Sequence, residues 1–232
     1  ANGSSDLALG YLQRAKALDP NGITLRASLA VCRQSLCDWS DLEQNAALVE
    51  DALAAAAAGK ESMPPFTAIM LAHPIGNREL LALARAHAAR FESLPSLAAQ
   101  PRPPSSRLRL GYLSADFHDH ATSHLIAGLL EHHDRGQFEV SAFSVGPDDG
   151  SDYRRRIEAA VEHFVDLRNL DDEHAAQAIA ARHVDLLIDL KGYTLGARPG
   201  ILARRPAPVQ VHYLGYPGTL GAAFIDYLVA DR

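Results

Sequence analysis

The sequence predicts a chain of two parts, α-helical repeats over residues 1–93 and a parallel α/β lobe over residues 107–232. Two observations lead to this prediction. Ala and Leu dominate the first part and recur with helical periodicity, whereas short apolar runs alternate with helical runs in the second. Between them, residues 94–106 contain four prolines and form a linker or boundary. The 232 residues suffice for one or two domains with a substantial core.

Composition excludes several classes of protein. Hydrophobic residues make up 47% and charged residues 22%, which is ordinary for a soluble globular protein. The net charge is −6 and no basic stripe is present, so we expect no nucleic-acid partner. Cys32 and Cys37 lie in one helix-like segment without a metal motif, and we interpret them as reduced thiols of a cytoplasmic protein. No run approaches the roughly 18 apolar residues of a membrane span, and no signal peptide opens the chain.

The first helices have the spacing of a known repeat. The second-helix and turn positions of a tetratricopeptide (TPR) repeat are matched by Ala8, Leu12, Ala15 and Pro20. The small alanines allow a neighbouring helix to approach, and Pro20 ends the helix. On this hypothesis the chain begins inside a repeat, so we expect further repeats upstream. A generic helical bundle is the alternative.

Two further helices complete the first part. Residues 37–59 predict one helix, with Asp38 or Ser40 as its N-cap, Glu43 completing a capping box and Gly59 at its end. The stretch "KESMPPF" breaks the chain, and residues 77–92 predict the next helix.

The second part reads as βαβ units. Strict alternation of predicted strands and helices implies right-handed crossovers and a parallel sheet with helices on both faces. Such sheets bind ligands at the carboxyl ends of their strands, so the loops 115–122, 145–152, 191–198 and 214–220 are candidate binding loops. We expect strands at residues 108–115, 138–145, 163–167, 184–190, 208–215 and 226–231, and helices at residues 122–133, 152–162, 172–183 and 198–205.

The first of these loops is rich in histidine. Thr122 or Ser123 can cap the helix that follows, and the free N–H groups of that helix favour an anionic ligand. The same dipole should keep His120 and His124 neutral, as hydrogen-bonding groups. The two histidines at the helix end, His132 and His133, are interpreted as structural C-terminal residues.

A metal site is the alternative function for this loop. His120 and His124 are four residues apart, and Asp116 and Asp119 lie nearby. However, no Glu follows the first histidine, and the spacing straddles a probable helix cap. We therefore expect no metal.

Two later loops carry glycines and hydroxyl groups. After the fourth strand, Gly192 and Gly196 allow close backbone approach to a ligand, beside the cations of Lys191 and Arg198. After the fifth, "LGYPGTLG" presents backbone N–H groups next to a rigid Pro217, which suits a neutral sugar; an ordinary tight turn is the alternative. Neither a G-x-G-x-x-G fingerprint nor a P-loop is present.

Six segments of the chain match the pattern of a known family: "CDWSDLE", "LRLGYLSADFHDHATSHL", "FEVSAFSVGPDDGSDYR", "HFVDL", "DLLIDLKGYTLGAR" and "RRPAPVQVHYLGYPGTLGAAFIDYLVADR". They resemble the protein O-linked N-acetylglucosamine transferases, most closely the bacterial members. The resemblance runs from about residue 6 to the end of the chain. It implies TPR repeats fused to a GT-B catalytic region of two Rossmann-like lobes, with inverting, metal-independent transfer of N-acetylglucosamine from UDP-GlcNAc to protein Ser or Thr.

The resemblance also implies roles for residues of this sequence. His120 matches a histidine that the family needs for activity, near the donor sugar, and we expect it to act as the general base or to orient the acceptor. The donor sugar should also contact Thr122, Leu214, Gly215 and Pro217. Contacts to the acceptor or within the loops are expected from His124, Tyr193, Thr194 and Thr219. A second family histidine, proposed as the base, has no counterpart near "SMPPFTAIM", since His73 lies several positions away.

We therefore expect the chain to be a fragment of a catalytic region. It would hold most of the first GT-B lobe and would be catalytically inactive on its own. The remaining C-terminal lobe, beyond Arg232, would grip UDP, and the acceptor protein would lie along the TPR surface. No cofactor is expected, because the UDP-sugar is a substrate. A related glycosyltransferase with another sugar or acceptor is one alternative, and a non-catalytic TPR scaffold is the other.

Overall fold

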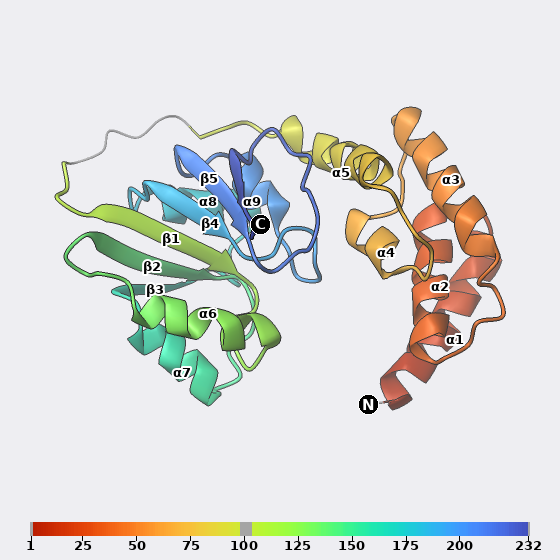
Figure 1. The fold of residues 1–232 in the computed structure, drawn as a ribbon, viewed down its shortest axis with the longest axis horizontal. Coiled ribbons are helices and arrows are strands. Elements are labelled where there is room, and N and C mark those ends of the chain that lie inside the picture. The colour runs from red at the N-terminus through yellow and green to blue at the C-terminus, as the bar shows by residue number, and fades with distance from the viewer. Residues whose placement is uncertain (1, 98–103, 232) are drawn as a thin grey trace. The chain divides into compact units, whose positions relative to one another are not determined.

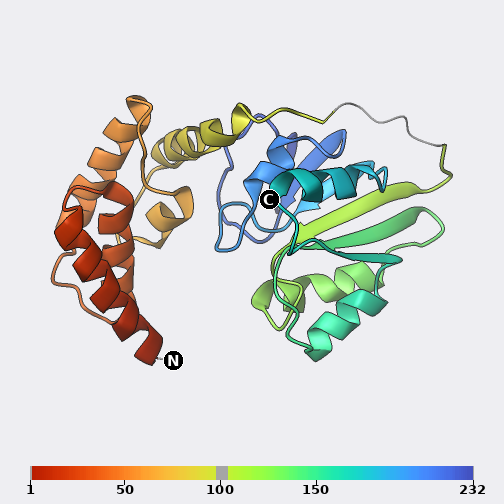
Figure 2. The same ribbon diagram turned by 180° about the vertical axis from the view of Figure 1, so that it is seen from behind.

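A computed structural model describes residues 2–97 and 104–231 of the chain. It divides the chain into two compact units (Figures 1 and 2). The helical unit extends to Arg90 and includes residues 218–222, and the α/β unit comprises the described residues of 91–217 and those from Ala223 onward. Part of the expected linker 94–106, residues 98–103, lies outside the described residues.

Helix α2 is central to the helical unit, where it packs against α1, α3 and α4. Small and aliphatic side chains form the core, including Ala27, Leu48, Ala52 and Leu83. The alanines let the helix backbones approach closely. The helices are α1 (Asn2–Leu18), α2 (Ile23–Ser35), α3 (Gln44–Ala57), α4 (Pro65–Met70) and α5 (Asn77–Glu92), whose last two residues belong to the α/β unit.

Two local predictions for this unit were wrong. Helix α3 begins only at Gln44, and no side chain caps it, so the expected capping box is absent. Asp38 is engaged elsewhere: its carboxylate accepts a hydrogen bond from the backbone of Ser40 within a turn. Helix α4 was not predicted, because the adjacent Pro64 and Pro65 indicate a break. Pro65 is in fact the first helical residue, where a missing N–H costs nothing.

The α/β unit contains a parallel sheet of six strands in the order β3-β2-β1-β4-β5-β6 (Figure 1). This order is that of a Rossmann-like fold, so the predicted fold class is confirmed. The strands are β1 (Leu108–Ser114), β2 (Phe138–Ser144), β3 (His163–Asp166), β4 (Leu186–Asp189), β5 (Val209–Tyr213) and β6 (Tyr227–Val229). The helices are α6 (Ala121–Glu131), α7 (Asp152–Ala159), α8 (Asp172–Ala180) and α9 (Pro199–Ala203).

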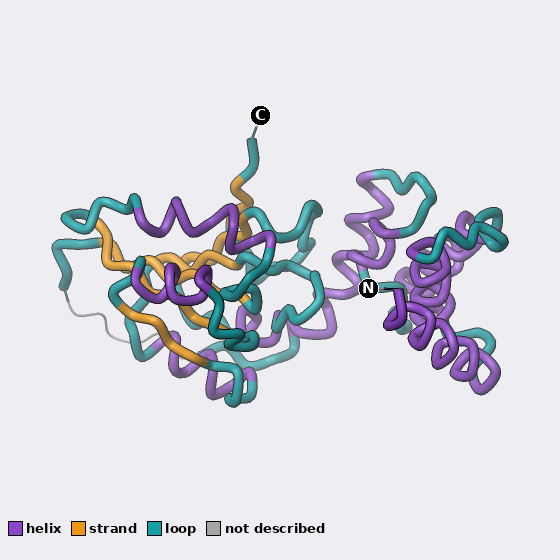
Figure 3. Tube along the Cα trace, turned by 90° about the horizontal axis from the view of Figure 1, so that it is seen from below, coloured by secondary structure: helices purple, strands orange, loops and turns teal. Residues whose placement is uncertain are grey.

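Helices cover both faces of this sheet. Helices α6 and α7 lie on one face and α8 and α9 on the other (Figures 1 and 3). Under α6 and α7 the core is largely apolar and includes Phe117, Ile126, Leu130 and Ile157. The chain turns from one side of β1 to the other after β3, which makes the carboxyl ends of β1 and β4 the switch point where such folds bind ligands. In the described part of the chain, no helix is long and apolar enough to cross a membrane.

Candidate functional site at the carboxyl edge of the sheet

A buried ion pair joins the loops that follow β1 and β4. The Nζ atom of Lys191 lies 2.8 Å from both carboxylate oxygens of Asp116. Both residues are more than nine-tenths buried. The same carboxylate accepts a hydrogen bond of 3.2 Å from the Thr122 hydroxyl, and the Ser123 hydroxyl donates to the Asp116 carbonyl. Asp116 therefore fixes the loop after β1 to the start of α6 and to the loop after β4.

His120 stands at the outer side of this network. It has extended backbone angles and is itself the N-cap of α6: its Nδ1 accepts a hydrogen bond of 3.1 Å from the Thr122 N–H. The prediction that Thr122 or Ser123 caps the helix was wrong, because their hydroxyls are taken by Asp116. His120 Nδ1 also lies 3.6 Å from Asp116 Oδ2, and 43% of the side chain is exposed.

This geometry sets the chemistry available to His120. An imidazole nitrogen that accepts a hydrogen bond carries no proton. With Nδ1 accepting from the Thr122 backbone, the neutral ring carries its proton on Nε2. His120 can therefore donate a hydrogen bond from Nε2 to a ligand, held in place by a helix start whose other N–H groups also favour negative charge.

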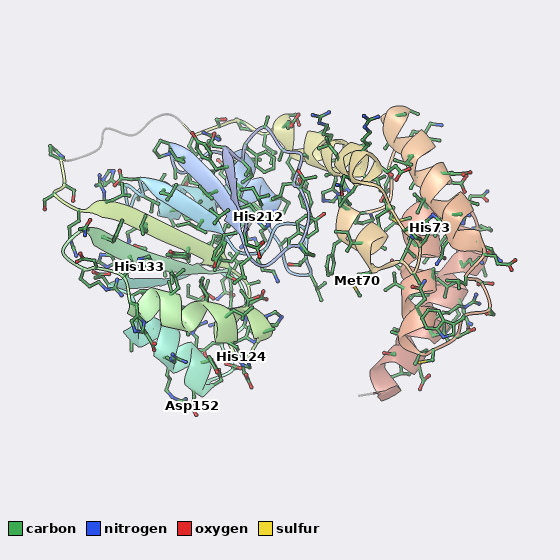
Figure 4. All side chains as sticks on the ribbon, in the orientation of Figure 1. Met70, His73, His124, His133, Asp152 and His212 are labelled. Carbon is green, nitrogen blue, oxygen red and sulfur yellow. The ribbon has the colours of Figure 1, made fainter. Side chains whose placement is uncertain are left out.

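The other histidines of this region have separate partners. His124 stacks on Tyr153 with 4.1 Å between ring centroids, and its Nε2 lies 2.7 Å from Asp119. At the end of α6, His132 is the C-cap and its Nδ1 donates to the Gly128 carbonyl, as expected for a structural residue. Figure 4 shows His124 and His133 at opposite ends of α6. Among the described residues, no group of three or more His, Cys, Asp or Glu side chains is placed to hold a metal ion.

The loop after β2 is tied to the histidine loop through Asp149. Its carboxylate accepts a hydrogen bond of 3.0 Å from the Asp119 N–H, and it lies 4.0 Å from His118 Nδ1. The backbone hydrogen bond from Asp119 is the main cause that lowers the pKa of Asp149 to about 2. Asp149 is therefore an anion at all physiological pH values.

A second buried pair links the ends of β4 and β5. Asp189 and His212 are directly opposite in the parallel register, and 2.9 Å separates Asp189 Oδ2 from His212 Nδ1. The other ring nitrogen lies 3.1 Å from the carbonyl oxygen of Tyr216. Burial would lower the pKa of His212, but the hydrogen bond and charge of Asp189 outweigh it, and the pKa is raised.

The turn after β5 packs directly on the turn after β4. Leu214 adopts a positive φ of 70°. A Cβ on Gly215 would meet the Leu190 carbonyl oxygen, and a Cβ on Gly192 would lie 2.5 Å from that of Tyr216. Glycine is therefore required at both positions. In the structure, the close approach that the absence of a Cβ permits at Gly192 is made by the Tyr216 side chain.

The remaining predicted contact residues stabilise these loops. Tyr193 is buried with its ring edge-on to Tyr216, and burial raises its pKa. The Thr194 hydroxyl donates to the Lys191 carbonyl over 2.7 Å. Thr219 lies in the segment 218–222 of the helical unit, where its hydroxyl accepts a hydrogen bond from the Gly221 N–H. Arg198 is anchored by Asp172 and by two carbonyls of the loop after β3, at Leu167 and Leu170.

Three residues of the two buried pairs were not recognised as paired from the sequence. Asp116 was considered only as a metal ligand, and Asp189 and His212 were not considered. One signal was available: an acidic residue follows the apolar run "LLI", and a histidine follows the run "VQV" of the next strand. The pairing itself depends on strand order, which the local pattern does not contain.

These loops and their strand order define a Rossmann-like lobe in which His120 stands at the N-terminus of α6, at the carboxyl edge of the sheet. The sequence model of glycosyl transferase family 41 matches residues 36–232. The chain therefore belongs to glycosyl transferase family 41.

Similar proteins carry the names of glycosyltransferases. The chain is 36% identical to the probable UDP-N-acetylglucosamine–peptide N-acetylglucosaminyltransferase SEC of Arabidopsis thaliana, covering 86% of this chain and 22% of the relative. It is 35% identical to the Caenorhabditis elegans UDP-N-acetylglucosamine–peptide N-acetylglucosaminyltransferase, covering 85% of this chain and 18% of the relative. The structure of a mutant Thermobaculum terrenum O-GlcNAc transferase matches with a TM-score of 0.77 and 27% identity, over 98% of this chain and 44% of that one. The chain thus spans about a fifth of the two curated relatives.

Proposed function

We propose that this chain supplies the first catalytic lobe of an inverting glycosyltransferase that moves N-acetylglucosamine from UDP-GlcNAc to Ser or Thr of proteins. One observation of the structure carries the proposal. A half-exposed imidazole, His120, is held by a buried network at the switch point of a Rossmann-like sheet. Family membership and the relatives' names supply the sugar and the acceptor class.

In this mechanism His120 acts as a hydrogen-bond donor. The acceptor hydroxyl oxygen attacks the anomeric carbon, the bond from that carbon to the phosphate oxygen breaks, and UDP leaves with the electron pair. Negative charge grows on the leaving phosphate, and a preorganised N–H aimed at that charge lowers the barrier. Nε2 of His120 supplies such a donor, because Nδ1 is occupied by the Thr122 N–H. The hydroxyl proton goes to a base that these residues do not supply.

The sugar would lie against the loops around His120. Thr122 stands beside His120 at the start of α6, and the turn Leu214–Pro217 offers backbone groups and a rigid proline. We expect this surface to contact a neutral sugar. We also expect transfer without a metal cofactor, since His120 and His124 direct their nitrogens to different partners.

The helical unit would guide the acceptor. We propose that α1 to α3 are TPR-like repeats in a cytoplasmic enzyme and that the acceptor protein lies along their surface. We assign no catalytic role to His73, which lies just after α4 in this unit (Figure 4). In this proposal a second, C-terminal lobe binds UDP.

A donor panel tests this function. The whole gene product is incubated with radiolabelled UDP-GlcNAc, UDP-glucose or UDP-galactose and with Ser- or Thr-containing peptides, with and without EDTA. We expect label on the peptide only from UDP-GlcNAc, unaffected by EDTA. Preferred transfer from another UDP-sugar would indicate a related glycosyltransferase. If the protein neither binds any of the UDP-sugars nor transfers from them, it is a non-catalytic scaffold. The 232-residue chain alone should bind donor with a dissociation constant of about 1 mM or weaker in calorimetry.

A further inference from the structure

We propose that Asp189 and His212 are positioning residues, a buried carboxylate–imidazolium pair that holds the turn 214–217 against the turn after β4. If the proposed function is correct, this pair fixes the turn that meets the donor sugar. The geometry that assigns this role comes from three successive connections.

The first connection is between the strands. Asp189 ends β4, and His212 is its register partner on β5. Their side chains are 2% and 0% exposed, and His212 Nδ1 donates to Asp189 Oδ2 over 2.9 Å. Figure 4 labels His212 near the carboxyl end of β5 in the α/β unit. A polar pair this deeply buried is retained only if its hydrogen bonds are made.

The second connection is to the two turns. Asp189 accepts hydrogen bonds from the backbone N–H groups of Lys191, at 3.0 Å, and Gly192, at 2.8 Å. On the other side, His212 Nε2 donates to the Tyr216 carbonyl over 3.1 Å. A continuous chain of hydrogen bonds therefore runs from one turn, through both side chains, to the other turn.

The third connection depends on a second N–H proton on the His212 ring. Both nitrogens of His212 face acceptors, the Asp189 carboxylate and the Tyr216 carbonyl. Neutral imidazole has one N–H and would satisfy only one of them, whereas imidazolium satisfies both. The direction of the His212 pKa, raised despite burial, agrees with this assignment.

The carboxylate of Asp189 supplies the negative charge that balances the His212 imidazolium. From the loop after β5, the Tyr216 ring lies 6.0 Å away, and the Tyr193 ring packs on Tyr216. From β6, the register partner of His212 is Leu228, which is apolar. The ammonium of Lys191 is directed to Asp116 rather than to Asp189.

Nuclear magnetic resonance on the 232-residue chain tests the pair without any assay of activity. The ring nitrogens of His212 are observed at pH 7.5, and amide exchange is measured at Gly215 of the turn. The variants are Asp189→Asn, which keeps the side-chain size, and His212→Gln. The control is His163→Gln, which removes a half-exposed imidazole paired with Glu139 at the other edge of the sheet.

We expect imidazolium at His212 in the wild type and a neutral ring protonated on Nε2 in Asp189→Asn. Amide exchange at Gly215 should rise at least about tenfold in both pair variants and not in the control. A neutral His212 in the wild type, or unchanged exchange at Gly215 in Asp189→Asn, would overturn the proposal. The wild-type spectrum decides the protonation state even if His212→Gln does not fold.

The whole gene product separates this inference from the proposed function. In Asp189→Asn we expect KM for UDP-GlcNAc to rise about tenfold while kcat stays within about threefold, because the sugar-facing turn is displaced but His120 is not. Faster exchange at Gly215 with an unchanged KM would confirm the pair as a positioning device and contradict the placement of the turn at the sugar. A wild-type protein without transferase activity would contradict the proposed function alone.

Discussion

The two edges of the sheet carry charged pairs of opposite character. At the amino edge, Arg107 reaches Glu139 over 3.3 Å and Glu162 over 3.2 Å, and all three side chains are a quarter to a third exposed. At the carboxyl edge, Asp116 pairs with Lys191 over 2.8 Å, and these side chains are 8% and 6% exposed. The Arg107 pairs lie in water-accessible positions beside strand starts, whereas Asp116 and Lys191 connect loops. The Arg109–Asp185 pair at the amino edge lies between these extremes, with side chains 12% and 22% exposed.

This difference indicates which edge has a positional task. Exposed pairs contribute about 0–1 kcal/mol and tolerate replacement. Buried pairs gain little over well-packed apolar residues, because desolvation offsets their attraction. Two buried pairs at the ligand-binding edge are therefore poorly explained by stability alone. They are explained by the need to hold three loops in one arrangement around His120.

Removing one member of the buried pair should have the largest effect. We expect Lys191→Met to lower the free energy of unfolding by about 3–5 kcal/mol, because it leaves the Asp116 carboxylate buried without a counter-charge. The matched change at the other edge, Arg107→Met, should cost less than about 1 kcal/mol. Urea unfolding followed by amide signals of the α/β unit measures both.

A double variant sharpens this first prediction. Asp116→Asn combined with Lys191→Met removes both charges and should recover at least about half of the loss. A Lys191→Met protein as stable as Arg107→Met would mean that the two edges do not differ.

The next effect is on catalysis at the exposed end of the network. In the whole gene product, His120→Asn and His120→Ala should each lower kcat about 100-fold or more, because neither side chain presents the Nε2 donor. Asn is a good N-cap, so only the alanine variant should also lose about 1 kcal/mol of stability. Steady-state kinetics and thermal unfolding separate the two effects. Turnover within a few-fold of wild type in His120→Asn would remove the imidazole from the mechanism.

The sequence predicted the fold because its main signals are local. Apolar runs such as "VDLLIDL" and amphipathic runs such as residues 172–183 identify strands and helices from their own residues. Strict alternation then restricts the sheet to parallel strands with helices on both faces. Helix starts were less well predicted. No side chain caps α3, and at α6 the hydroxyls of Thr122 and Ser123 bond to Asp116 instead, which depends on tertiary structure.

The candidate site was predicted only in part, for the same physical reason. His120 was found because it precedes a helix at the end of a strand, which is a local property. Asp116 and Lys191 lie far apart in the sequence, and only the adjacency of β1 and β4 brings them together. Likewise, Asp189 and His212 meet through the register of β4 and β5. Pairs of this kind require the strand order before they can be recognised.

The pH dependence of stability distinguishes the two edges further. Because the pKa of His212 is raised in the folded state, its contribution is complete below its ordinary pKa of 6.5 and is lost as pH rises through the folded value. We expect the free energy of unfolding of the α/β unit to fall above pH 6.5. His212→Gln should lack this component, and His163→Gln at the amino edge should keep it.

The half-buried histidine of the helical unit, His87, does not interfere with that measurement. Burial is the main cause that lowers the pKa of His87 to about 4, so its contribution is lost as pH falls below 6.5. The two pH windows therefore do not overlap. Equal slopes above pH 6.5 in the wild type and in His212→Gln would show that His212 does not change its proton affinity on folding.

Salt should produce the smallest effect, and it should act on the exposed Arg107 pairs rather than on the buried pairs of the carboxyl edge. Raising NaCl from about 0.05 M to about 0.5 M shortens the Debye length from over 10 Å to about 4 Å. The exposed pairs of Arg107 should then weaken by less than about 1 kcal/mol in total, whereas the buried pairs at the carboxyl edge are shielded from ions. Urea unfolding at the two salt concentrations should therefore show a small loss in the wild type and in Asp189→Asn, and a smaller loss in Arg107→Met. An equal loss in all three proteins would place the salt-sensitive charges elsewhere and remove this distinction between the edges.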